Sequence, residues 1–96
     1  MDFNEAFGSV FRSLRLMRGL TQEAFLPSAT ERYVRNIEKA KQTPTVDMVR
    51  NLCDVLRVSP ITLMAIVEAK HTGKDTEALI KAAMTELKNI KKTSDI

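Results

Sequence analysis

The chain has 96 residues, which is enough for one compact core and too few for a catalytic domain joined to a separate binding domain. Hydrophobic residues make up 44% and charged residues 28%, with three glycines and three prolines, a balance that excludes a disordered or fibrous protein. The net charge is +3, but residues 7–45 alone carry +4, which suggests a polyanionic partner and fits a solvated charged face equally well.

Two helices are predicted at the start of the chain. Five apolar residues recur there at steps of four and three: Phe3, Phe7, Val10, Leu14 and Met17. This spacing places one apolar stripe on a helix over about residues 4–18. Thr21 is a typical N-cap, and Pro27 follows soon after it, so the second helix is expected to be short, at roughly residues 22–26.

A third helix is predicted from its cap residue, Thr30, to about Lys39, after a tight connection through residues 27–29. Val34 and Ile37 point inward, and polar residues occupy the outward arc: Glu31, Arg32, Arg35 and Asn36. A short helix, a turn and a helix with a polar outer face allow one helix to enter the major groove of DNA while its neighbour braces it on the backbone. A generic helical hairpin has the same lengths and is the alternative.

Two further helices complete the predicted core. Thr45 begins the first of them, which has an inward apolar stripe: Val49, Leu52, Cys53 and Leu56. Ser59 before Pro60 caps the second, which should reach about Ala69. We expect this helix to be largely buried through five apolar residues: Ile61, Leu63, Met64, Ile66 and Val67.

The last predicted element is an amphipathic helix over residues 75–92, after a polar hinge at residues 71–74. The preceding helices can close a core by themselves, so the apolar side of this one predicts a pairing surface. We expect a homodimer through this helix and the one before it, with a central set of apolar residues: Leu79, Ile80, Ala83, Leu87 and Ile90. Folding of the helix back onto its own domain is the alternative.

Residues 7 to about 64 resemble the helix-turn-helix domain of phage repressors, Cro proteins and related bacterial regulators. The matching residues, in chain order, are Gly8, Leu14, Arg15, Leu20-Thr21-Gln22-Glu23, Ile37-Glu38, Pro44-Thr45, Val58-Ser59 and Leu63. The resemblance implies an all-α fold, with a five-helix repressor-like DNA-binding domain at residues 1–69 and an appended dimerisation helix at residues 70–96. It implies a sequence-specific transcriptional regulator, expected to be a repressor, that binds a near-palindromic operator as a homodimer.

Two features depart from the family pattern. The stretch from Gln22 to Glu38 is about two residues shorter than usual, and Pro27-Ser28 replaces a turn that contains glycine. The angle between the second and third helices is therefore left open. Ala40 stands where the family usually has glycine, so if this position needs a positive φ, the alanine is strained, or else the turn differs.

The resemblance assigns base reading, or contact with the nearby backbone, to the outer arc of the third helix. The candidate base readers are Glu31, Arg32, Tyr33, Arg35 and Asn36. Their chemistry fits this role, because arginine pairs with guanine, asparagine with adenine, and glutamate with the amino group of cytosine. Alternatives stay open for three of them: Glu31 can stabilise the helix N-terminus, Arg35 can bind a phosphate, and Tyr33 can pack at the rim of the core.

Phosphate contact is assigned to residues on the flanking segments: Gln22, Thr30, Lys39, Lys41 and Thr43. Gln22 begins the second helix, where unpaired N–H groups favour an anion. The lysines and Thr43 follow the third helix and can fix register without reading sequence, although ordinary surface positions are the alternative. Arg15 and Glu38 match the positions of a structural salt bridge that, in the family, ties the first helix to the end of the third.

Other function classes lack support in the sequence. Cys53 has no second cysteine to pair with, His71 has no neighbouring cysteine or histidine, and no phosphate-binding loop or nucleophile motif occurs. We expect no catalysis, cofactor, metal or small-molecule substrate, and a cytoplasmic protein without a signal peptide or membrane span. The alternative function is an antitoxin-like or adaptor module in which the C-terminal helix binds another protein and DNA contact is secondary.

Overall fold

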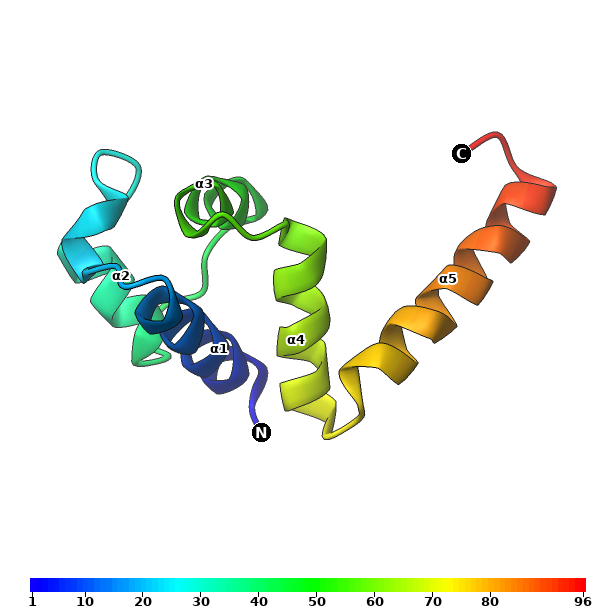
Figure 1. The fold of residues 1–96 in the computed structure, drawn as a ribbon, viewed down its shortest axis with the longest axis horizontal. Coiled ribbons are helices and arrows are strands. Elements are labelled where there is room, and N and C mark those ends of the chain that lie inside the picture. The colour runs from blue at the N-terminus through cyan, green and yellow to red at the C-terminus, as the bar shows by residue number, and fades with distance from the viewer.

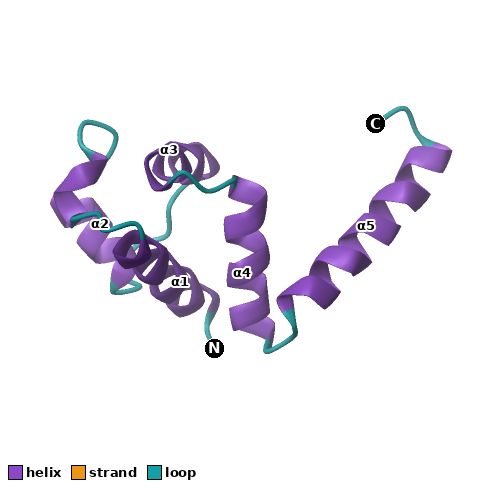
Figure 2. Cartoon of the chain, viewed as in Figure 1, coloured by secondary structure: helices purple, strands orange, loops and turns teal.

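The computed structural model describes residues 1–96 and is helical throughout, with no strand (Figures 1 and 2). The elements in chain order are α1 (Phe3–Met17), the 3₁₀ helix η1 (Gln22–Phe25), α2 (Glu31–Glu38), α3 (Val46–Leu56), α4 (Pro60–Thr72) and α5 (Thr76–Thr93). The predicted all-α fold is confirmed.

Each α-helix begins with a side chain that accepts a backbone N–H from its first turn. These caps are Asp2, Thr30, Thr45, Ser59 and Asp75. Thr21 makes no such bond, and the predicted second helix is a single 3₁₀ turn in which the Leu26 N–H bonds to the Glu23 carbonyl. Because Pro27 has no N–H and keeps Leu26 extended, the turn cannot continue as an α-helix.

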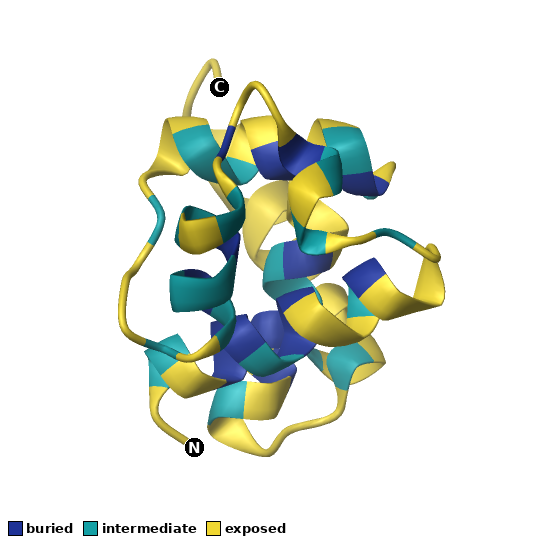
Figure 3. Ribbon diagram, turned by 90° about the vertical axis from the view of Figure 1, so that its left-hand side faces the viewer, coloured by how far each residue is buried: buried dark blue, intermediate teal, exposed yellow.

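The core lies where α1, η1, α2, α3 and α4 face one another, whereas both chain ends and most of the connections are exposed (Figure 3). Ala29, in the connection before α2, is buried in the core. Phe11 of α1 and Phe25 of η1 are fully buried, with ring centroids 5.3 Å apart. Val34 and Ile37 attach α2 to this core through its predicted inner face. Cys53 is buried among the same side chains, as expected of a core residue.

Gly8 permits the close crossing of α1 and α2. A Cβ at this position would lie 2.5 Å from the backbone oxygen of Ile37 and 2.9 Å from that of Glu38. Only a residue without a side chain allows this approach. The crossing brings the end of α2 against the middle of α1.

The fourth α-helix differs from expectation in its length and its burial. It continues past Ala69 to Thr72, and the chain turns at Gly73 in the left-handed region, with φ 76°. Leu63 and Val67, one helical turn apart, are buried, but Ile61 is 81% exposed. The prediction of a largely buried helix was therefore wrong for Ile61, because only one face of α4 meets the other helices.

The last helix, α5, leaves the bundle after this hinge and points away from the other helices (Figure 1). It packs against α4, and none of its residues is buried. Its apolar stripe is therefore largely open to solvent, with Ile80, Met84, Leu87 and Ile90 among the exposed large hydrophobic side chains.

Candidate nucleic-acid interface

The outer face of α2 is open to solvent, because its inner face is fixed to the core by Val34 and Ile37. Among the five predicted base readers, Arg32 is exposed, and the other four are partly exposed: Glu31, Tyr33, Arg35 and Asn36. A helix presented in this way is free to approach a base edge.

The side chains on this face differ in whether they already have a partner within the chain. Glu31 and Arg35 pair across one turn, with 3.8 Å between Arg35 Nη1 and Glu31 Oε1. Tyr33 packs against the rim of the core, and burial raises the pKa of its hydroxyl. Arg32 has no ion-pair partner, so it is the free cation of the helix.

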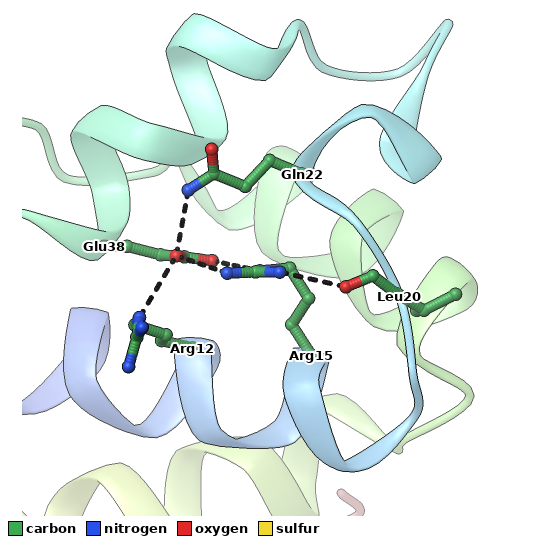
Figure 4. Close-up of polar contacts among 5 residues, drawn as sticks. All are labelled: Arg12, Arg15, Leu20, Gln22 and Glu38. Carbon is green, nitrogen blue, oxygen red and sulfur yellow. Dashed lines mark hydrogen bonds and ion pairs between the residues drawn. The ribbon is translucent and has the colours of Figure 1, made fainter.

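A buried ion pair fixes the C-terminal end of α2 to α1. Arg15 Nε donates to Glu38 Oε2 at 2.6 Å, and Arg15 Nη2 donates to Glu38 Oε1 at 2.9 Å (Figure 4). The Glu38 side chain is only 4% exposed. The third nitrogen of Arg15, Nη1, donates to the Leu20 carbonyl at 2.9 Å. The hydrogen bonds to Glu38 raise the pKa of Arg15 above its usual value, so the guanidinium is held charged.

Gln22 takes part in the same cluster, which the sequence did not indicate. Its Nε2 donates to Glu38 Oε1 at 3.1 Å, so the start of η1 is tied to the end of α2. Gln22 stays partly exposed, which leaves room for contact with an external anion.

Arg12 reaches the same carboxylate oxygen, with 4.0 Å between Arg12 Nε and Glu38 Oε1. The sequence could have indicated the role of Arg12, because Arg12 lies three residues before Arg15 and therefore on the same face of α1.

The segment after α2 is held by backbone hydrogen bonds. The Ala40 N–H bonds to the Ile37 carbonyl at 3.1 Å and the Lys41 N–H to the Asn36 carbonyl at 2.9 Å, which together form a Schellman motif. This motif requires a left-handed residue, and Ala40 adopts φ 59° without being glycine. The alanine is thus strained, at the position where the resemblance to repressor-type helix-turn-helix domains implies glycine.

The predicted phosphate-binding residues are all at or near the surface. Lys39, Lys41 and Thr43 are exposed, and so is Thr30. The Thr30 hydroxyl oxygen caps α2 by accepting the Tyr33 N–H at 3.1 Å. The Thr43 hydroxyl donates to Asn4 Oδ1 at 2.7 Å, so it is already bonded within the chain and ties this loop to α1.

Four of the five predicted pairing residues form the α5 side of an apolar groove between α4 and α5. The groove has a volume of about 550 Å³ and is lined mainly by Ile61, Met64, Ala65, Leu79, Ile80, Ala83, Met84 and Leu87. Ile90 lies one turn beyond Leu87 and is exposed. The structure therefore brings four of the five predicted residues to one surface and adds Ile61 and Met64 from α4.

The remaining chemically active side chains have local contacts. His71 Nδ1 lies 2.7 Å from the Met1 carbonyl oxygen, and its ring contacts Phe3 edge-on. No group of three or more histidine, cysteine, aspartate or glutamate residues is placed to hold a metal ion. None of the helices combines the length and apolar character needed to cross a bilayer.

Comparison with known proteins gives two matches. The family model described as a helix-turn-helix domain matches residues 6–65. A protein of Sinorhizobium fredii, named as an uncharacterized HTH-type transcriptional regulator, y4dJ, is 33% identical over 75 residues, which cover 76% of this chain and 97% of the relative. No solved structure matches the chain.

Proposed function

The chain belongs to the helix-turn-helix family, and on that premise we propose that it is a sequence-specific transcriptional regulator that reads duplex DNA with α2. The observation that carries the proposal is the polar, at least partly exposed outer face of α2, on a helix whose inner face is buried in the core and whose C-terminal end is tied to α1 by the Arg15–Glu38 pair. A helix held in this way can present side chains to base edges in a constant register. The name of the Sinorhizobium relative supports the regulatory role.

Arg32 and Asn36 are the proposed principal readers. They lie four residues apart and therefore on the same side of α2. Arg32 has no partner within the chain and can bind guanine with two hydrogen bonds, and Asn36 can bind adenine likewise. Glu31 and Arg35 would have to separate from each other before either could contact a base, so we give them a secondary role.

Phosphate contacts on both sides of α2 would fix the position of that helix on the duplex. We assign them to Gln22 and Thr30 before the helix and to Lys39, Lys41 and Thr43 after it. Their surface positions support this assignment. Contacts of this kind give affinity without reading sequence and make binding dependent on salt.

We propose that two copies bind a near-palindromic operator, with the two α2 helices about 34 Å apart. The exposed apolar stripe of α5 and the groove beside it support pairing between copies, because they form one apolar surface on a small chain. The two parts would be a DNA-binding unit at residues 1–69 and a dimerisation element at residues 70–96. A cytoplasmic protein of this size can repress by occupying its operator.

Selection of bound sequences from random duplex DNA tests the reading function. The expected result is a palindrome with half-sites about ten base pairs apart. Arg32→Ala and Asn36→Ala should each reduce affinity by about 1–3 kcal/mol and relax preference at one position of each half-site. Lys70→Ala, an exposed change on α4, is the matched control and should leave the selected sequence unchanged. If both reader variants select the wild-type sequence with wild-type affinity, the proposed readers are wrong.

Sedimentation of the wild-type chain and of Leu87→Lys tests the pairing surface. The wild type should sediment as a dimer, and the lysine should convert it to a monomer with weaker operator binding, because a charge cannot be desolvated in an apolar interface. Lys81→Ala on the same helix is the control and should stay dimeric. A monomeric wild type that copurifies with another protein, lost on truncation at Gly73, would instead favour an antitoxin-like or adaptor role for the uncovered face of α5.

A further inference from the structure

Arg12 lies on α1 beside the cluster around Glu38, but its charge is not neutralised there. Its Nε is 4.0 Å from Glu38 Oε1, the limit of an ion pair, and its side chain is 61% exposed. Its guanidinium donates no hydrogen bond within the chain. The terminal nitrogens of Arg12 are therefore available to an external anion.

The Glu38 carboxylate is already satisfied by other groups. All three guanidinium nitrogens of Arg15 bond inside the protein, two of them to Glu38 and one to the Leu20 carbonyl. The Gln22 amide donates to the same Oε1 that Arg12 approaches. One carboxylate thus faces two guanidinium groups, so the cluster has a net positive charge. The exposed Arg12 side chain presents this charge to solvent.

Arg12 Nε and Gln22 Nε2 approach Glu38 Oε1 from opposite sides, at 4.0 and 3.1 Å, so both side chains lie beside one carboxylate oxygen (Figure 4). Gln22 is a proposed phosphate contact, so an anion bound there would lie within reach of Arg12. A guanidinium binds phosphate with two parallel hydrogen bonds and is weakly hydrated, which suits it to this role.

We infer that Arg12 is a further phosphate-binding residue, which holds the DNA backbone next to Gln22. The inference rests on the proposed DNA-binding function. Because Arg12 also faces the carboxylate that fixes the end of α2, a phosphate on Arg12 would be positioned relative to the recognition helix. Arg12 therefore contributes to affinity and register, without reading bases.

The test compares the full-length wild type with Arg12→Gln on a mixed-sequence duplex of about 30 base pairs, long enough for two half-sites and their flanks. Binding is measured over a range of salt concentrations. The slope of log K against log [salt] should become shallower by about 0.9 for each Arg12 that contacts a phosphate, with a loss of affinity of about five- to tenfold at low salt. The sequence preference and the thermal unfolding midpoint should not change.

Two further variants show whether the effect is local and depends on charge. Arg50→Gln removes an exposed arginine from α3, outside the proposed contacts, and should keep the wild-type slope. Arg12→Lys keeps the charge and should recover most of the slope. An unchanged slope in Arg12→Gln, or a loss of binding that follows a large drop in unfolding temperature, overturns the inference while DNA binding by the wild type stands. If the wild type shows no salt-dependent binding to any duplex, the proposed function itself fails.

Discussion

Arg15 and Glu38 are 23 residues apart in the chain, yet they meet through two parallel N–H···O bonds of 2.6 and 2.9 Å. The pair joins the last turn of α1 to the last residue of α2. Only 9% of the Arg15 side chain and 4% of the Glu38 side chain are exposed. Each charge is therefore stabilised mainly by the other charge and not by water. The position of α2 therefore depends on a contact between charged groups inside the protein.

Removal of Glu38 should destabilise the fold strongly. In Glu38→Ala the Arg15 guanidinium is left buried without its partner, so the free energy of unfolding should fall by about 3–5 kcal/mol in urea denaturation. Glu31→Gln is the matched control, since it breaks only the exposed pair with Arg35 and should cost less than about 0.5 kcal/mol. A loss below about 1 kcal/mol in Glu38→Ala would contradict a structural role for the pair.

Gly8→Ala should force α1 and α2 apart. The added methyl would lie 2.5 Å from the Ile37 carbonyl oxygen, which belongs to backbone and cannot rotate away. We expect a loss of about 1–3 kcal/mol in thermal or urea unfolding, and weaker DNA binding even where the variant is folded, because α2 is displaced. Ser9→Ala, at the next position of α1, should change stability by less than about 0.5 kcal/mol. Equal stability of the two variants would show that the crossing can relax.

Ala40→Gly should stabilise the protein. At φ 59° an alanine costs about 1–2 kcal/mol that glycine does not, and the greater freedom of glycine in the unfolded chain offsets part of this gain. The net increase in the free energy of unfolding should be about 0.5–1 kcal/mol. Lys39→Gly, one residue earlier at φ −90°, should instead destabilise, because no strain is relieved there. The same sign for both variants would contradict the strained Schellman turn.

The stability of the fold should decrease at alkaline pH. Burial, and then the charge of Asp54, raise the pKa of Cys53 above its ordinary 9.0, so the native state keeps the thiol proton more tightly than the unfolded chain. This contribution is complete below the unfolded pKa and is lost as the pH rises through the folded one. The unfolding free energy should fall as the pH rises above 9.0, and the raised pKa of Tyr33 adds to the fall above pH 10.0. The unfolding free energy of Cys53→Ala should fall less steeply over the same range. Equal slopes for the two proteins would exclude Cys53 as the cause.

Much of the fold was predictable from local pattern. The apolar stripes located the five α-helices, and short polar residues marked the starts of α2, α3 and α4, because a side-chain cap acts within one turn of its own helix. The resemblance brought Arg15 and Glu38 together as a candidate pair. The 3₁₀ form of η1 was not predicted, although Pro27 limited its length.

The sequence by itself determined which residues face inward and where most of the helices begin, since both depend on helical periodicity and on bonds between near neighbours. Only the tertiary structure decided that Gln22 and Arg12 share one carboxylate oxygen, that Ala40 is strained, and that Ile61 and the stripe of α5 stay exposed. These features depend on how closely helices distant in the chain approach each other. That approach is set by packing at positions such as Gly8, and local pattern does not encode it.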